Sequence, residues 1–304
     1  MVGVVAVVLG ATACGASTGA EGSVLRVERA AFPVALTTDR EGVLLYAERL
    51  TGRIRRVREA DGVDPTSVAR VGVATEGQRG LLGVARDGRG RIFAAYTSRA
   101  IGRPLQVAQV VPAFRVVWIG PPSANLANGG HLVYDRRRRQ LILGIGDLGQ
   151  RAKVADPNAV NGKLLLLDPD AALTQHPAVL SQGWNNPFAF TLTPGGALWV
   201  ADNVPGEKGE RIARGDVGGR PSHITMLPTN TVPAAIAALS DTTLVVCGFA
   251  HGRTLRYEIR SGRAVKGDGF GDDARCRTGI ATGTHGVALW LADERSIREL
   301  TSRR

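Results

Sequence analysis

The sequence contains few cysteines, few lysines and no long hydrophobic run. Three cysteines among 304 residues are too few for a scaffold held together by disulfides. No apolar run reaches the roughly 18 residues of a membrane-spanning helix, which excludes a transmembrane protein. Charged residues make up 21% of the chain and are mixed along it, which argues against a disordered chain.

Acidic residues are also in the minority, with 27 Asp and Glu against 38 Lys and Arg and a net charge of +11. Only four of the basic residues are lysines. Such a charge attracts anionic envelope polymers, or nucleic acid when the basic residues form a stripe with interleaved aromatics. No such stripe is present, and the densest run, Arg136 to Arg139, stands where a turn is expected. We therefore expect solvated, scattered arginines and no nucleic-acid partner.

The first residues resemble an export signal. Residues 2–13 are small and apolar, which suits the core of a signal peptide and is too short to cross a bilayer. The run ends at Cys14, which a Gly- and Ser-rich stretch follows, as at a bacterial lipoprotein cleavage site. Ala11, where such sites usually have Leu, and the lack of a basic residue before the run leave ordinary secretion open.

An exported chain divides naturally into three parts. We expect a signal peptide over 1–13, a lipidated Cys14 with a flexible tether over 14–23, and one folded domain over 24–304. The protein is then a membrane lipoprotein or is secreted, and it folds in an oxidising compartment. Cys247 and Cys276 remain as an even pair that could form a disulfide, with two separate core cysteines as the alternative.

Short strand-like runs recur along the body of the chain. Six of them start at Leu44, Ile92, Leu141, Leu198, Leu244 and Leu289, at intervals of 48, 49, 57, 46 and 45 residues. A turn-rich segment and another strand precede each run, and no segment has a sustained helical period. Several strands per repeat of this length are typical of a β-propeller. The sequence therefore predicts an all-β fold with six blades.

The last repeat is one strand short when the chain ends. An open sheet edge is an aggregation hazard, so a propeller has to close its ring. The strand-like segment Val24 to Glu28 follows directly after the tether. We expect this N-terminal strand to pair with the last blade and close the propeller.

Four motifs follow one another through the middle of the chain. They are EGQRGLLGVA from Glu76, NGGHLVYD from Asn128 with LGIGD from Leu143, ADPNAVNGKLL from Ala155, and GWNNPFAF from Gly183 with LWVAD from Leu198. In this order they resemble the signatures of the soluble glucose and sorbosone dehydrogenases that depend on pyrroloquinoline quinone (PQQ). The resemblance implies a six-bladed propeller whose top-face pocket holds PQQ through calcium and oxidises an aldose or related sugar at C1.

The same resemblance shows where the catalytic machinery departs from the family. The family's catalytic His precedes Asn-Gly-Gly, where this chain has Ala127. His131 is the remaining candidate base, but four residues along a strand correspond to about 13 Å. The family's Arg before Asn-Pro is Asn185 here, although Asn186 is kept.

The remaining cofactor contacts are also implied by motif position. The candidate cofactor- or sugar-binding residues are Gln78, Asn186, His251, Arg275 and Arg277. The family's calcium is bound largely by main-chain carbonyls after the fourth blade's central strand, which correspond to those of Val204 and Pro205. PQQ and calcium are therefore implied cofactors, with part of the usual PQQ-binding set replaced.

Two functions remain open, because a fold does not fix a function. One is a PQQ-dependent sugar dehydrogenase with a rearranged site. The other is a non-catalytic envelope lipoprotein that binds a glycan or a protein on the top face of the propeller. In either case we expect a monomer with a sugar or glycan ligand, attached to the membrane through its lipid.

Overall fold

The fold is described from a computed structural model. It covers residues 22–39, 41–58, 62–64, 66–204, 209–270, 274–283 and 288–301. The expected signal peptide, the lipidation site Cys14 and the calcium candidate Pro205 lie outside these residues.

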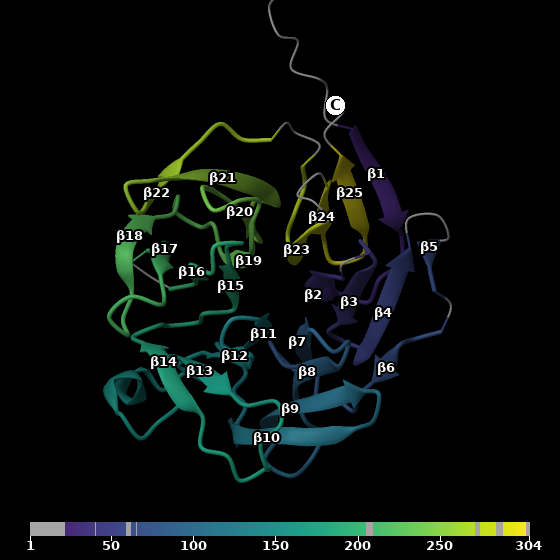
Figure 1. Ribbon diagram of the computed structural model, residues 1–304, viewed down its shortest axis with the longest axis vertical. Coiled ribbons are helices and arrows are strands. Elements are labelled where there is room, and N and C mark those ends of the chain that lie inside the picture. The colour runs from purple at the N-terminus through teal and green to yellow at the C-terminus, as the bar shows by residue number, and fades with distance from the viewer. Residues whose placement is uncertain are drawn as a thin grey trace, which may run out of the picture.

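Six antiparallel sheets stand around a central channel (Figure 1). The first strand of each sheet lines the channel. From the channel outward, blade one contains β2 (Pro33–Thr38), β3 (Leu44–Glu48), β4 (Arg53–Arg58) and β5 (Gly62–Val63), and blade two contains β7 (Leu81–Arg86), β8 (Ile92–Thr97), β9 (Pro104–Val111) and β10 (Arg115–Pro122). Blade three contains β11 (Gly129–Asp135), β12 (Gln140–Ile145), β13 (Lys163–Leu167) and β14 (Ala178–Gln182), and blade four contains β15 (Ala189–Leu192), β16 (Leu198–Asp202), β17 (Arg211–Arg214) and β18 (Ser222–Met226). Blade five contains β19 (Pro233–Ala238), β20 (Thr243–Gly248), β21 (Arg253–Arg260) and β22 (Arg263–Lys266), and blade six contains β23 (Gly279–Thr282), β24 (Ala288–Ala292), β25 (Ile297–Thr301) and β1 (Gly22–Val27). The predicted all-β, six-bladed propeller is confirmed.

The second strand of every blade begins within one residue of a predicted central run. These strands are buried because sheets pack on both of their faces. Six hydrophobic clusters fill the molecule, one between each pair of neighbouring blades.

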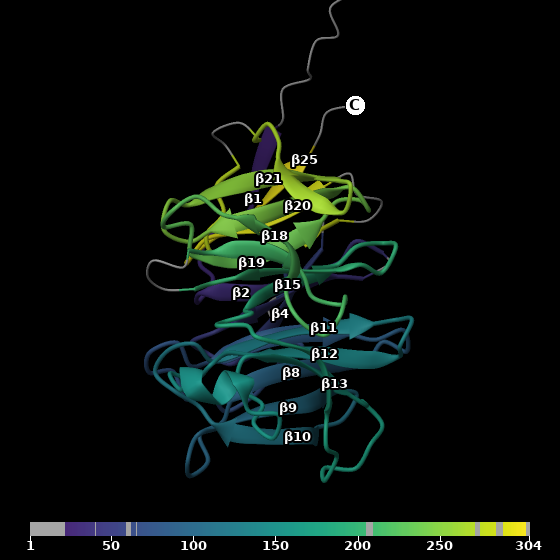
Figure 2. The same ribbon diagram turned by 90° about the vertical axis from the view of Figure 1, so that its left-hand side faces the viewer.

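Two short elements lie outside the regular pattern of four strands per blade. The strand β6 (Ala69–Arg70) also pairs with β4, and the 3₁₀ helix η1 (Arg151–Ala155) projects from the third blade (Figure 2).

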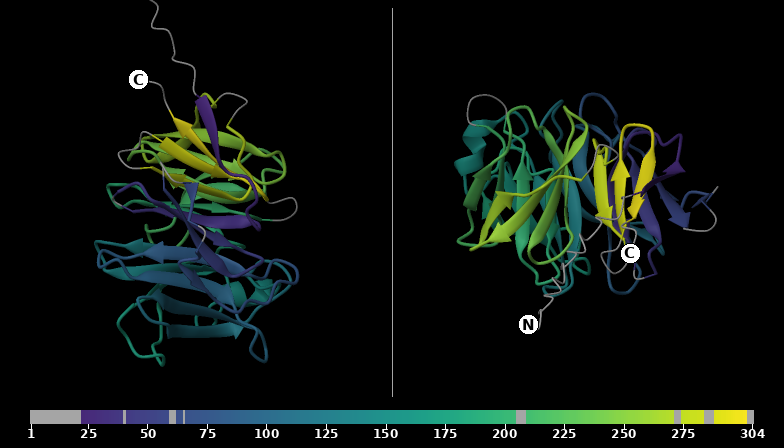
Figure 3. Two further views of the ribbon diagram at one scale, coloured as in Figure 1. Left: turned by 90° about the vertical axis from the view of Figure 1, so that its right-hand side faces the viewer. Right: turned by 90° about the horizontal axis from the view of Figure 1, so that it is seen from above.

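The ring closes as the sequence predicts, with an N-terminal strand in the last blade. β1 runs antiparallel to β25, with Val24 opposite Glu299 (Figure 3). Arg26 forms an ion pair of 2.7 Å with Glu299, whose side chain is 2% exposed. Val27 is buried in the cluster between the last and first blades. The strand begins at Gly22, slightly before the predicted start. No helix in the described part of the chain has the length and apolar character needed to cross a membrane.

A disulfide joins the last two blades. Cys247 lies in β20 and Cys276 lies shortly before β23, and their Cα atoms are 5.2 Å apart. Both side chains are fully buried in the cluster between the two blades. The bond closes a loop with a sequence separation of 29 residues.

Replacing both cysteines with alanine is expected to lower the free energy of unfolding by about 3–4 kcal/mol, because the unfolded chain loses a loop constraint of this length. Urea denaturation of the variant and of the parent checks this. Reduction of the parent is the control and should reproduce most of the loss. Alkylation of two free thiols in the non-reduced parent would contradict the disulfide.

Candidate functional site

A cavity of about 190 Å³ lies where the inner strands of the blades begin. We call it the mouth cavity. Its lining includes the segments that lead into β2, β7, β11, β15, β19 and β23, so every blade contributes. The residues that carry its chemistry are Arg49, Gln78, Asn128, Asn186 and Asn203, with the rings of Phe32, Phe188 and Phe249. Three of the motifs found in the sequence therefore meet at one end of the channel.

Arg49 is the cation of the mouth cavity. Its Nη1 donates to the carbonyls of Gly77 at 2.9 Å and Arg79 at 2.8 Å. Its guanidinium lies 4.4 Å from the ring centroid of Phe32. Its Nε is buried and has no hydrogen-bond partner among the described groups, and burial lowers the pKa of the side chain. A charged donor without an acceptor is costly, so this edge of the cavity favours a ligand oxygen.

Hydrogen bonds hold the loop that carries the position of the family's base, and several of them come from Arg79, which donates to Ser123 and Asn125. Gln78 accepts the backbone N–H of Ala127 at 2.8 Å through Oε1. Asn128 closes the same loop, since its side chain bonds both backbone groups of Ala124 at 2.8 and 2.9 Å. Ala127 has a φ of 53°, which is the left-handed region. Beside Ala127, where the resemblance expects a base, stands the amide side chain of Gln78, which comes from the segment before β7.

The two neighbouring asparagines of the fourth motif diverge. Asn186 lines the mouth cavity, and its Oδ1 accepts the N–H of Gly129 at 3.0 Å. Asn185 does not line it, because its Nδ2 donates to Oδ2 of Asp147 at 2.6 Å. Asn185 instead borders a larger pocket between blades three and four. The first asparagine thus supports Asp147, and the second reaches the cavity.

The carboxylate of Asp202 fixes the backbone of Asn185 and Asn186. Its carboxylate accepts the N–H groups of Asn185 and Asn186 at 2.9–3.2 Å and pairs with Arg211 at 2.9 Å. The side chain is fully buried. Burial raises the pKa of Asp202, and the charge of Arg211 acts in the opposite direction. This carboxylate is structural and has no route to the mouth cavity.

The other cation candidates do not line the mouth cavity. Arg277 pairs with Glu294 at 3.3 Å, and its guanidinium lies 5.9 Å from the ring of Phe249, which does line the cavity. His251 and Arg275 are exposed. The structure thus brings Gln78 and Asn186 together with Arg49, a residue that the sequence analysis missed. Arg49 directly follows a central strand, and that position at the mouth was the available signal.

Of the two calcium candidates, only Val204 lies among the described residues. Val204 is buried and borders the pocket between blades three and four, whereas its neighbour Asn203 lines the mouth cavity. Pro205 lies outside the described residues. Among the residues that the structure does describe, no group of three His, Cys, Asp or Glu side chains could hold a metal ion.

His131 lies in the central channel and does not line the mouth cavity. Its ring packs edge-on against Phe190, with centroids 4.7 Å apart. Burial lowers its pKa from 6.5 to about 4, although a hydrogen bond with the backbone of Phe190 opposes the shift. A histidine with so low a pKa is neutral at pH 7 but is a weak base.

His131 is expected to make folding sensitive to acid. Its folded pKa of about 4 lies below the unfolded value of 6.5, so the unfolded chain takes up the proton first. The contribution of neutral His131 to the free energy of unfolding is complete above pH 6.5. It falls by about 3 kcal/mol as the pH drops towards 4. Urea denaturation across this pH range should show that the free energy of unfolding falls more steeply for the parent than for His131→Phe. Parallel curves would contradict the burial of a neutral imidazole.

Comparison with known proteins agrees with this arrangement. The family model described as glucose/sorbosone dehydrogenase matches residues 30–218, more than half of the chain. No curated protein sequence matches the chain.

Solved structures with the same fold are similar over nearly their whole length. The PQQ-bound aldose sugar dehydrogenase from Streptomyces coelicolor is 21% identical, with a TM-score of 0.73 over 93% of this chain and 99% of the other. The apo form of the soluble aldose sugar dehydrogenase from Escherichia coli is 19% identical, with a TM-score of 0.77 over 93% and 100%. A putative glucose dehydrogenase from Thermus thermophilus is 22% identical, with a TM-score of 0.76 over 92% and 99%. Together with the family model, the motifs and their meeting at the mouth cavity lead to one conclusion: the chain belongs to the glucose/sorbosone dehydrogenase family.

Proposed function

We propose that this family member binds a small sugar in its mouth cavity without oxidising it through a quinone. One observation carries the proposal: among the described lining residues, Arg49 is the only ionisable side chain. Removal of a hydroxyl proton needs a base with a pKa near the working pH, and neither an arginine nor an amide provides one.

The chemistry of the lining suits a neutral sugar. The amides of Gln78, Asn186 and Asn203 can exchange hydrogen bonds with hydroxyl groups. The aromatic rings supply the apolar surface that ligand cavities combine with a few polar groups. Arg49 adds a donor that lacks an acceptor. The substrate class of the family thus matches the ligand class of the cavity.

The described residues do not fit PQQ in the way that the resemblance implies. The family holds this tricarboxylate with several cations and deprotonates the sugar with histidine. Here one guanidinium lines the cavity, Asn185 is bonded to Asp147, and the matching base position is Ala127. No oxidation step is therefore assigned to these residues.

A second function, quinone-dependent sugar oxidation, is favoured by one observation. The Nε of Arg49, which has no hydrogen-bond partner among the described groups, is available to donate to a carboxylate of the cofactor in place of a missing cation. This candidate requires a substitute base and predicts turnover, which the first candidate does not. The two are separated by the activity assay described in the Discussion.

We also propose that the protein works outside the cytoplasm as a monomer. The apolar run over 1–13, Cys14 and the tether over 14–23 support export with a lipid anchor, and secretion is the variant of this proposal. Cys14→Ala is expected to move the expressed protein from the membrane fraction to the soluble fraction. Unchanged partitioning would remove the anchor from the proposal.

Calorimetric titration with D-glucose, in the absence of PQQ, tests sugar binding. Gln78→Leu is expected to weaken binding about tenfold, since one hydrogen bond to the ligand is lost. Gln140→Leu is the matched control, because Gln140 begins β12 and does not line the cavity. If no aldose binds, or if both variants behave alike, the mouth cavity is not the sugar site.

A further inference from the structure

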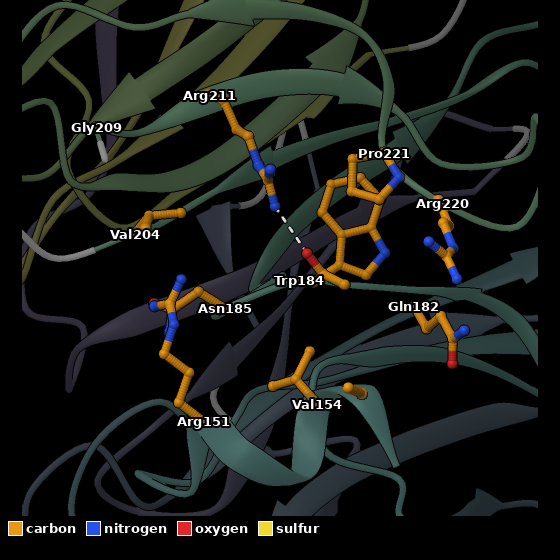
Figure 4. Close-up of a pocket in the computed structure, with 12 residues that line it drawn as sticks. Arg151, Val154, Gln182, Trp184, Asn185, Val204, Gly209, Arg211, Arg220 and Pro221 are labelled. Carbon is orange, nitrogen blue, oxygen red and sulfur yellow. Dashed lines mark hydrogen bonds between the residues drawn. The ribbon is translucent and has the colours of Figure 1, made fainter. Parts of the chain in front are cut away.

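A second opening, between blades three and four, lies beside the mouth cavity and has a different character. It measures about 380 Å³, twice the volume of the mouth cavity. η1, the end of β14 and the segments before β17 and β18 line it. Three arginines, Arg151, Arg211 and Arg220, surround Trp184 there (Figure 4). We call it the arginine pocket.

Charge in the arginine pocket is strongly positive. No carboxylate is found among its described lining residues. Arg211 is neutralised by Asp202, but Arg151 and Arg220 are exposed and make no hydrogen bond or ion pair with a described residue. Two guanidinium groups thus stand at the edge of one concave surface without a partner among the residues that the structure describes. Such groups match carboxylate and phosphate oxygens with two parallel hydrogen bonds.

The base of the pocket is preorganised. Trp184 is 1% exposed, and its Nε1 donates to Oγ of Ser181 at 3.0 Å. Arg211 lies 5.5 Å from the indole centroid and donates to the carbonyl of Gly183 at 2.8 Å (Figure 4). Asp202 holds Arg211 from the opposite side. A ligand would therefore meet a fixed wall and would order only the two outer arginines.

The segment that carries Arg151 is also fixed. Lys163 is fully buried, and its ammonium donates to the carbonyls of Asp156 and Ala159 in the loop after η1. Val154 of η1 and Pro221 add apolar surface to the pocket (Figure 4). Gln182 adds an amide. The lining therefore combines an oxyanion site with surface for a hydroxylated, partly apolar body.

We propose that the arginine pocket binds an acidic sugar, whose oxyanion attracts the exposed arginines Arg151 and Arg220. The volume suits one sugar unit that carries a carboxylate or a phosphate. This site is distinct from the mouth cavity, because neighbouring residues face the two openings: Asn185 and Val204 line the arginine pocket, and Asn186 and Asn203 line the mouth cavity. The proposal does not depend on sugar binding at the mouth.

Calorimetric titrations of the purified protein with D-glucuronate, D-glucose 6-phosphate and inorganic phosphate test the proposal. At least one acidic sugar is expected to bind, with an affinity that falls as salt is added. The tighter of the two identifies the oxyanion as carboxylate or phosphate. Inorganic phosphate that binds as tightly as both sugars would overturn the claim that the pocket accepts a sugar body.

Charge-matched variants locate the site. Arg151→Gln and Arg220→Gln should each weaken the acidic sugar about tenfold or more, since a charge-assisted hydrogen bond is lost. Arg263→Gln in β22 removes the same charge elsewhere on the surface and should change little. Equal losses for all three variants would mean attraction to the net charge of +11 and would overturn the pocket. D-glucose binding should be the same in all three, so failure here is distinguishable from failure at the mouth cavity.

Discussion

With PQQ, calcium and D-glucose supplied, the protein is expected to reduce an electron-acceptor dye no faster than a sample without enzyme. The double variant Ala127→His with Asn185→Arg is expected to bind PQQ more tightly by tenfold or more, because a charge-assisted hydrogen bond contributes about 1.5–3 kcal/mol. Absorbance titration of the quinone measures binding, and dye reduction measures turnover. Each single variant should do less, since a base and a cation that serve one transition state need not act additively.

The structure gives physical room for both substitutions. Ala127 has a φ of 53°, and histidine is among the residues that adopt this region most readily. Asn185 borders the open arginine pocket and directly precedes Asn186 of the mouth cavity, so the longer arginine side chain has room close to that cavity. Ala127→Leu with Asn185→Gln is the matched control. Robust quinone-dependent turnover by the unmodified protein would refute the proposed function and establish the second candidate, with Arg49 as the first residue to replace.

A protein that starts at residue 29 is expected to melt roughly 10 °C or more below one that starts at Gly22. The shorter form loses β1, the burial of Val27 and the partner of the buried Glu299. Losses of this kind amount to several kcal/mol, and each kcal/mol shifts the midpoint of a domain of this size by about 2 °C. Calorimetry of the two forms measures the difference.

The exposed edge of β25 should also make the shorter protein aggregate, because an unpaired strand is a template for other chains. Adding a synthetic peptide of residues 22–28 should restore part of the lost melting temperature. Equal melting temperatures for the two forms would mean that β1 adds no stability to the last blade and does not close the ring.

The blades were predictable because their signals are local. Turn residues and strand runs recur at a nearly constant spacing, and the missing last strand pointed to β1. The short strands β5 and β6 were not predictable, since each has two residues, too few to show an alternating pattern. Motifs also placed Gln78 and Asn186 at the channel mouth. Arg49 was missed because its role depends on the carbonyls of Gly77 and Arg79, which another blade contributes.

Side-chain direction explains why the other sequence candidates do not meet at the cavity. Arg275 and Arg277 flank Cys276, whose buried disulfide with Cys247 fixes the backbone there. Arg277 then reaches Glu294, and Arg275 stays exposed. His131 has the expected strand position, but the inner strand β11 presents it to the channel and not to the mouth. The order of motifs along the chain cannot reveal which face of a strand a side chain occupies.

The pairing of β1 with β25 also sets the timing of folding during synthesis. β1 is synthesised long before its partner β25, since Val24 pairs with Glu299. Contacts between such distant segments form slowly, because a long chain loop has to close first. The ring can therefore close only after β25 has been synthesised, and a shorter nascent chain presents two open sheet edges.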